Sequence, residues 1–190
     1  MTPSTPEPGP GPHARFLDVA YEMFSTRPYQ KISVEAIARE AGVSKSLLFY
    51  HFGSKEELAR KALLHGFDRE LAEFGPIEEL DEEMVRLALP SFLQLSLNRI
   101  QVIHTFTEVV DIDDPEDELV KAMRHLYDYL VGIIGRFHET RGERYPYEKA
   151  MLITLAVDLF GWIEKIKGEE PDLDRYVNAI LDMMGMEVEA

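Results

Sequence analysis

Hydroxyl, amine, phenol and imidazole groups are concentrated in the short stretch between residues 44 and 55. Such groups exchange hydrogen bonds with the edges of DNA bases, and amines also neutralise phosphates. An α-helix fits the major groove of B-DNA, so the outward side chains of a helix here can reach both. The candidates for DNA contact are Ser33, Ser44, Lys45, Ser46, Leu47, Phe49, Tyr50, His51 and Lys55.

Two short helical patterns joined at a glycine must position these side chains. Apolar residues recur at three- and four-residue spacing from 34 to 41, and Ser33 can cap the free amides at the start of that helix. Gly42 can adopt the positive φ that a sharp exit needs, and Ser44 can cap a second helix whose Leu48 turns inward. The sequence therefore predicts a helix-turn-helix.

A third helical pattern follows directly. Ser54 and Glu57 have the spacing of a capping box, and the helix that they open should continue to about Phe74. At 1.5 Å per residue it would be roughly 30 Å long. Gly75 and Pro76 then break the chain. We expect this helix to act as a lever between a DNA-binding head and the rest of the molecule.

The segment from Phe16 to Leu58 resembles the DNA-binding domain of the tetracycline-repressor (TetR) family of one-component regulators. The resemblance is carried by Phe16, Leu17, Ala20, Phe24, Tyr29, Ile37, Ala38, Ala41, Gly42, Val43, Ser44, Leu48, Phe52, Ser54 and Lys55. Leu47 stands where the family often has threonine, Phe49 where tyrosine is usual, and Pro28 where glycine is common. Phe49 has no hydroxyl for a phosphate, whereas Leu47 can pack against a thymine methyl, so the base preference should be particular to this chain.

The resemblance also implies the rest of the architecture. Family members are homodimers in which the last two helices form a four-helix interface, and the two heads read a pseudo-palindromic operator. Their C-terminal domain binds a small, often apolar or amphipathic effector, which changes the separation of the heads. For this chain we therefore expect an all-α fold, with a DNA-binding domain over residues 13–58 and an effector-binding and dimerisation domain over 59–190.

Composition fits this division. The 190 residues can bury a real core, and the absence of cysteine fits a reducing cytoplasm, where we expect the protein to work. Residues 1–12 lack the features of a signal peptide and are expected to be a disordered tail. The most apolar stretch, 151–163, is too short to span a bilayer, so no membrane is expected as a partner.

Charge is divided unevenly along the chain. The formal net charge is −15, yet residues 12–65 carry eight Lys and Arg against six Asp and Glu, a balance of +2. The acidic remainder would be repelled by DNA while the basic end approaches it. The asymmetry therefore favours one orientation on the duplex.

Helical patterns also fill the C-terminal part. We expect helices at about Glu82–Arg99, Ile100–Val110, Pro115–Arg141, Pro146–Lys167 and Leu173–Met184. Asp114 and Pro115 form a cap and first-turn pair, and Gly142 is a stop signal. Pro90 should kink or split the first of these helices.

The helix expected at 146–167 is apolar nearly all round, which a surface helix cannot sustain. The helix at 173–184 has an apolar stripe of its own, and the pair can cover each other across a two-fold axis. The predicted dimer interface consists of Leu159, Ile163, Val177, Ile180, Leu181 and Met184. The alternative is a monomer whose final helix closes the core.

Aromatic and apolar side chains on the central helices suggest a ligand pocket. The candidates are Phe92, Leu95, Ile103, His104, Phe106, Met123, Tyr127, Leu155 and Trp162, although such stripes are also typical of ordinary core. His104 and Glu108 share a helix face, but the acidic run after them lacks the spacing of a calcium loop, so neither metal nor cofactor is expected. Asp158 lies in the most apolar segment, where it either makes a structural hydrogen bond or recognises an effector.

These patterns together predict a ligand-responsive DNA-binding transcriptional regulator. A repressor that binds its operator as a dimer and is released by a small effector is the expected form, and an activator stays possible. The competing class is an all-helical ligand carrier or enzyme that does not read DNA. It has little support, because the sequence has no cysteine nucleophile and no glycine loop for phosphate.

Overall fold

The structure, a computed structural model, describes residues 12–74, 80–168 and 171–188. Within these ranges the chain forms helices and no strand, which confirms the all-α class. The elements are α1 (Pro12–Thr26), the 3-10 helix η1 (Tyr29–Lys31), α2 (Val34–Ala41), α3 (Lys45–Phe52), α4 (Lys55–Phe74), α5 (Glu82–Val109), α6 (Glu118–Thr140), α7 (Pro146–Lys167) and α8 (Leu173–Met183). The expected tail, apart from Pro12, and the expected break at Gly75 and Pro76 lie outside the described residues.

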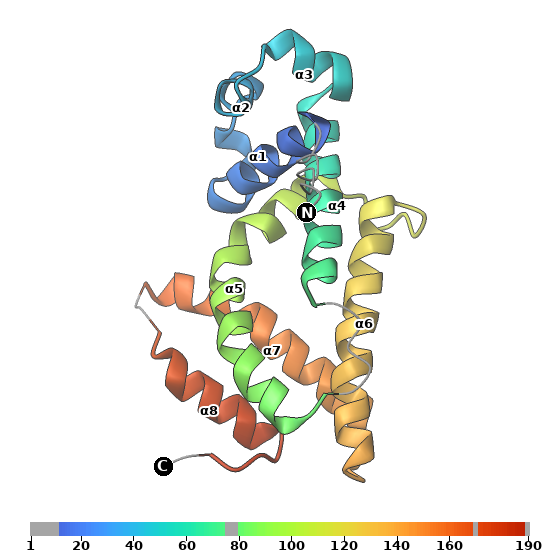
Figure 1. The fold of residues 1–190 in the computed structure, drawn as a ribbon, viewed down its shortest axis with the longest axis vertical. Coiled ribbons are helices and arrows are strands. Elements are labelled where there is room, and N and C mark those ends of the chain that lie inside the picture. The colour runs from blue at the N-terminus through green and yellow to red at the C-terminus, as the bar shows by residue number, and fades with distance from the viewer. Residues whose placement is uncertain (1–11, 75–79, 169–170, 189–190) are drawn as a thin grey trace, which may run out of the picture.

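Helices α1 to α3 form a head at one end of the molecule, and α4 runs from this head into a body built from α5 to α8 (Figure 1). The division of the chain at residue 58 stays a prediction. One apolar core joins the head to α4, where Leu58, Leu63 and Phe67 are buried. The same core includes Phe106 of α5 and Leu119 of α6, so the body supplies part of the packing beneath the head.

The helix-turn-helix has the predicted local geometry. Ser33 Oγ accepts a hydrogen bond from the Ala36 amide at 3.1 Å, and Ser44 Oγ accepts one from the Leu47 amide at 3.2 Å. Gly42 has φ +70°, the left-handed conformation that ends α2. Leu48 is 1% exposed and fixes the inner face of α3. The turn that presents α3 is therefore encoded by residues next to it in the sequence.

The start of α4 differs in part from the predicted capping box. Ser54 Oγ does accept a hydrogen bond from the Glu57 amide, at 3.0 Å. The reciprocal half is wrong, because the Ser54 amide donates to the Phe52 carbonyl and the Glu57 carboxylate pairs with Lys61 Nζ at 3.3 Å. Only the serine side of the capping box forms.

Two predicted boundaries in the body are wrong. Residues 82–109 form one helix, α5, instead of two, and this helix continues through Pro90. Leu89 and Leu93 are both buried in the body core, and their packing holds the helix on either side of the proline. Helix α6 starts at Glu118 rather than Pro115, because the Asp117 carboxylate caps it by accepting the Leu119 amide at 2.8 Å.

The last helix packs mainly onto its own chain. Ile180, Leu181 and Met184 are buried against α5 residues such as Val85 and Leu89. Val177 is partly buried beside them. These four residues were predicted at the dimer interface. Ile180, Leu181 and Met184 are buried within their own chain, and the dimer interface itself stays a prediction. Among the described residues, no helix is both long enough and apolar enough to cross a membrane.

A set of polar contacts, here called the polar seam, joins the head to the body at the C-terminal end of α5. Arg60 of α4 donates to the Val109 carbonyl at 2.6 Å and to Asp117 Oδ1 at 2.9 Å. The hydrogen bond from Arg60 lowers the pKa of Asp117 from 3.8 to about 2. Gln30 Nε2 of η1 donates to Glu108 Oε1 at 2.9 Å. The seam therefore ties the lever helix to the loop between α5 and α6.

Candidate DNA-reading surface and ligand cavity

Helix α3 presents most of the predicted DNA-contacting side chains to solvent. Tyr50 is 83% exposed, and Ser44, Ser46, Leu47, Phe49 and His51 are also exposed. Leu48 and Phe52 point into the head and are buried, so one face of α3 anchors the helix and the other is free to enter a groove. Contact with DNA by these residues stays a prediction.

The two lysines of the predicted set have partners within the head. Lys45 Nζ forms an ion pair with Glu35 and lies 5.4 Å from the centroid of the Phe49 ring, and this hydrogen-bonded pair lowers the pKa of Glu35. Lys55 Nζ donates to the Tyr29 carbonyl at 2.6 Å and lies 3.8 Å from the Tyr29 ring centroid. Burial lowers the pKa of Lys55. Contact between Lys55 and a phosphate would therefore compete with η1.

His51 belongs to a small aromatic cluster at the end of α3. Its ring centroid is 5.3 Å from that of Tyr50, 6.1 Å from that of Phe16 and 6.2 Å from that of Phe52. The His13 ring of α1 lies 6.0 Å away. His51 thus packs beside Phe52 and remains exposed, which leaves its imidazole available to a ligand on the same surface as Tyr50.

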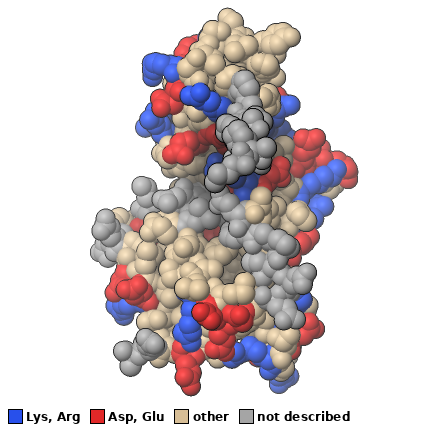
Figure 2. All heavy atoms as spheres, viewed as in Figure 1, with Lys and Arg blue, Asp and Glu red and all other residues tan. Residues whose placement is uncertain are grey.

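Charge is distributed unevenly over the face shown in Figure 2. The tip of the head is mostly neutral, and both basic and acidic residues lie below it. Asp and Glu gather at the side, towards the loop between α5 and α6, and at the far end of the body. The acidic body is therefore held away from the surface that α3 presents.

A cavity of about 970 Å³ lies where the head meets the body. Its volume is in the range of known ligand pockets. Its walls come from α1, α4, α5, α6 and α7, and the lining also includes Leu80, before α5, and Met184, after α8. The apolar walls are formed by Val85, Ala88, Leu89, Phe92, Leu97, Ile100, Val102, Leu130, Ile133, Ile134, Ile153 and Val157, and polar groups come from Tyr21, Glu22, Ser25, Thr26, Arg69, Glu70, Ser91, Ser96, Gln101, Tyr129, Thr154 and Asp158.

The predicted pocket residues overlap little with the lining of this cavity. Phe92 lines the cavity, and the side chain of Leu95 lies outside the described residues. The lining does not include Ile103, His104, Phe106, Met123, Tyr127, Leu155 or Trp162. Ile103, His104, Leu155 and Trp162 are on the surface, whereas Phe106 and Met123 pack in the core under the head. Apolar periodicity predicts the helices, but it does not determine which face of each helix surrounds the cavity.

Glu70 of α4 brings a carboxylate to the boundary between head and body. It is 6% exposed, and its Oε1 accepts a hydrogen bond from the Tyr21 hydroxyl of α1 at 2.6 Å. The Tyr21 ring crosses α4 at Gly66, where a Cβ atom would lie 2.1 Å from the ring. The absence of a side chain at residue 66 therefore lets the first helix of the head reach the wall of the cavity.

Asp158 of α7 supplies a second carboxylate on the opposite side. It lines the cavity and is half-buried, and its Oδ2 accepts a short hydrogen bond from the Tyr127 hydroxyl. Tyr127, predicted to line the pocket, instead supports a residue that does. The structural hydrogen bond expected for Asp158 is present, and the same side chain faces the cavity. Recognition of an effector by Asp158 stays a prediction.

The outer face of α7 is apolar and exposed. Leu159 and Ile163, predicted at a dimer interface, are 52% and 46% exposed. They belong to a stripe at helical spacing that consists of Met151, Leu152, Leu155, Leu159, Trp162, Ile163 and Ile166. Ile153 and Phe160, on the opposite face of α7, are buried in the body core. The part of the chain that the structure describes therefore covers only one face of α7.

Sequence reasoning missed Tyr21, Glu70 and Ser96. Glu70 lies among charged residues of α4 that read as a solvated face, and Tyr21 reads as core of the head. The sequence does place Glu70 four positions after Gly66, so the two residues share one face of the helix. The sequence does not show that α1 packs on this face, because the hydrogen bond between Tyr21 and Glu70 joins residues 49 positions apart.

Comparison with known proteins identifies the relatives of the chain. Residues 16–62 match the sequence model of the bacterial regulatory proteins of the tetR family. The HTH-type transcriptional regulator UidR of Escherichia coli (strain K12) is 34% identical over 166 residues, which are 82% of each chain.

Solved structures share the fold. A putative transcriptional regulator from Saccharomonospora viridis, in complex with choline, has a TM-score of 0.65 at 23% identity and covers 90% of this chain and 94% of its own. The regulator FadR from Bacillus subtilis, in complex with stearoyl-CoA, has a TM-score of 0.64 at 16% identity and covers 90% and 97%. The helix-turn-helix, the body of helices behind it and the identity to UidR agree, and the chain belongs to the TetR family of DNA-binding transcriptional regulators.

Proposed function

We propose that this regulator binds a pseudo-palindromic operator as a homodimer, represses transcription there, and is released by a small ligand in the cavity. The observation that carries this proposal is the shared wall of the cavity, to which α1 and α4 contribute beside α5, α6 and α7. A ligand in such a cavity touches the DNA-binding head itself. A protein that reads operators in a bacterial cell works in the cytoplasm.

The exposed face of α3 supports the DNA-reading step. Tyr50 and Lys45 stand on this face, and Leu47 adds an apolar group of a size suited to a thymine methyl. Lys45 would exchange its ion pair with Glu35 for a phosphate or a base, because both partners are exposed and an exposed ion pair contributes little. We therefore assign base reading to the exposed residues among 45–50 and backbone contacts to the surrounding polar groups.

The exposed stripe on α7 supports the dimer. Contiguous exposed apolar surface on a protein of this size is typical of an association site. Two copies that pack their stripes together about a two-fold axis would present two heads to DNA, and the symmetry of the operator would mirror that of the protein. The interface that we propose consists of Leu159, Ile163 and the other exposed α7 residues, without the buried residues of α8.

Release requires a ligand that prefers the DNA-incompetent arrangement, since equal affinity for both arrangements shifts nothing. The apolar walls of the cavity favour an apolar or amphipathic ligand. Choline and stearoyl-CoA, the ligands of the two structural neighbours, differ widely in size and charge. The ligand of this chain must therefore be judged from its own cavity.

The proposal is tested by selection from random duplex DNA, followed by titration of the selected sequence against scrambled DNA at about 150 mM salt. An inverted repeat should be enriched and bound at least about 1000-fold more tightly than scrambled DNA. Lys45→Ala and Tyr50→Ala should each weaken specific binding about tenfold, because each removes a contact of about 1–3 kcal/mol.

Lys61→Ala is the matched control, because it removes an exposed lysine of α4 that pairs with Glu57 and lies outside α3. Its effect on operator affinity should be less than about twofold, because it contacts neither bases nor the flanking backbone. Absence of any enriched sequence, or equal losses in all three variants, would contradict the proposal and favour a helical ligand carrier or enzyme.

A further inference from the structure

We propose that the cavity holds an extended, single-chain amphiphile, with its polar group beside α1 and its unbranched apolar tail along α5 as far as Met184. Met184 would then limit the length of the tail. The inference rests on the proposed function, because it names the kind of ligand that this function requires.

The cavity is long in the direction of α5. The α5 residues that line it run from Val85 to Val102, and at about 1.5 Å per residue this stretch of helix is about 25 Å long. One end lies against α1 of the head, where Ser25 and Thr26 belong to the lining. The other end lies at the start of α5, beside Met184. A volume of about 970 Å³ spread over such a length favours an extended molecule over a compact one.

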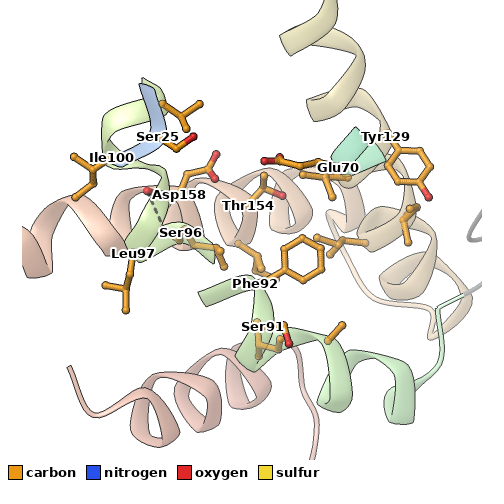
Figure 3. A pocket seen from close by; sticks show the side chains of 18 of the residues that line it. Ser25, Glu70, Ser91, Phe92, Ser96, Leu97, Ile100, Tyr129, Thr154 and Asp158 are labelled. Atoms are coloured by element: carbon orange, nitrogen blue, oxygen red, sulfur yellow. Dashed lines mark hydrogen bonds between the residues drawn. The ribbon is translucent and has the colours of Figure 1, made fainter. Parts of the chain in front are cut away.

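Polar side chains are concentrated at the end of the cavity near the head. The lining residues that come from α1 and α4 all carry polar groups. In Figure 3 the side chains of Ser25, Glu70 and Asp158 lie in the upper part of the view, whereas Phe92 and Ser91 lie below them. A hydrocarbon tail packed against these polar groups would keep water from them, which costs free energy. The polar group of an amphiphile is therefore favoured at this end.

The opposite end of the cavity is apolar. In the lining formed by residues 80–91 and Met184, Ser91 carries the only polar side chain that the structure describes. The apolar members of this group are Leu80, Val85, Ala88, Leu89 and Met184. Each methylene group that is buried against such a surface raises affinity about fourfold, so this end suits a hydrocarbon tail.

Met184 forms a fixed wall at the apolar end. It is 3% exposed, it follows α8 directly, and its amide donates to the Ile180 carbonyl at 2.9 Å. Gly185 then turns the chain at φ +69°, and its carbonyl accepts a hydrogen bond from Arg141 Nη2 at 2.8 Å. The backbone of Met184 therefore cannot move away without loosening the end of α8, and a longer tail would meet its side chain.

A series of 1-monoacylglycerols tests the inference, because its members share one small neutral polar group and differ only in the length of the tail. The full chain, without DNA, is equilibrated with an equimolar mixture of saturated chains of eight to eighteen carbons. Native mass spectrometry then gives the relative occupancy of each member. We expect occupancy to rise with chain length to an optimum and then to fall at least about tenfold, because overpacking is unfavourable.

Met184→Ala should move the optimum to chains longer by about two or three carbons, because it frees the space of three non-hydrogen atoms. Ala88→Leu adds three such atoms at the same end and should move the optimum to shorter chains. It fills space in the cavity, so it preserves the test if Met184→Ala fails to fold. Met183→Ala is the matched control and should leave the optimum unchanged, since Met183 is 57% exposed and lies outside the lining. Folding of each variant is checked by its thermal unfolding.

Occupancy that rises with chain length without an optimum would overturn the inference and would indicate binding on the exposed stripe of α7. So would the absence of any bound monoacylglycerol, or an optimum that stays in place in the folded variants of Met184 and Ala88. These measurements contain no DNA, so their failure is distinct from failure of the proposed function. Loss of operator binding in the selection experiment would contradict that function and would leave the preference for one chain length standing.

Discussion

The head and the body of this regulator are held together in different ways. The turn that presents α3 depends on Ser33, Gly42 and Ser44, each of which acts on residues within a few positions of itself. The body depends on contacts between distant helices, such as the hydrogen bonds from Ser96 of α5 to the Val157 carbonyl and from the Gly161 amide to Ser96. Local signals thus build the surface that reads DNA, whereas long-range packing builds the cavity.

The difference predicts that a substitution at a helix crossing in the body costs more than one at a turn in the head. Gly161→Ala gives the largest effect that we expect. Its Cβ would lie 2.3 Å from the Ser96 carbonyl oxygen and 2.9 Å from the Leu97 Cα, and backbone atoms cannot rotate away. Unfolding in urea should show a loss of about 3 kcal/mol, at the upper end for overpacking.

Gly132→Ala provides the matched control in α6. Its Cβ would meet only the far end of the Arg136 side chain, at 3.8 Å. Alanine in a helix interior should then raise stability by about 0.5–1 kcal/mol relative to glycine. If Gly161→Ala unfolded at the same urea concentration as the parent protein, that result would contradict the close packing of α5 against α7 at this residue.

The seam between the two regions should show an intermediate effect that depends on pH. The hydrogen bond from Arg60 holds the pKa of Asp117 near 2 in the folded chain, below its ordinary 3.8. The carboxylate therefore stabilises the fold above about pH 4, and this contribution is lost as the pH falls from about 4 towards 2.

Asp117→Asn should lower the free energy of unfolding by up to about 2.5 kcal/mol at pH 6, because the pKa of Asp117 falls from 3.8 to about 2 and each pKa unit corresponds to about 1.4 kcal/mol. Urea unfolding should show the gap between variant and parent shrinking as the pH is lowered towards 2. Asp113→Asn, in the same exposed loop, serves as the control and should track the parent protein. A gap that stayed constant with pH would exclude this role for the Arg60 contact.

The smallest effect is expected in the head. Gly42→Ala places a side chain at φ +70° and should cost about 1 kcal/mol, because a left-handed conformation disfavours a Cβ. Gly42→Asn should cost less, since asparagine tolerates this region better. Thermal unfolding of the two variants gives the comparison. A loss as large as that of Gly161→Ala would mean that the turn supports more of the molecule than its local contacts indicate.

The same contrast explains what could be predicted from the sequence. Ser33, Gly42, Ser44 and Leu48 were placed correctly, because caps, a positive φ and helical periodicity act over a few residues. The bounds of α7 were predicted correctly as well, since a proline begins the helix and a glycine follows it.

Side-chain roles in the body were predicted less well. Trp162 and Leu155 face outwards and Phe106 belongs to the core beneath the head, because periodicity gives the faces of a helix without saying which neighbour covers each face. Met184 was placed at an intermolecular interface and instead closes the core of its own chain. The cavity could not be derived, because Tyr21 and Glu70 meet across 49 positions that no local pattern connects.

The shared wall between cavity and head has a thermodynamic consequence for the proposed switch. If a ligand lowers operator affinity by some factor, operator DNA must lower ligand affinity by the same factor. The protein would then have two different ligand affinities, a higher one when free and a lower one on its operator. Ligand would bind first to protein that is not on DNA. Repression would be relieved only at ligand concentrations above those that saturate the free protein.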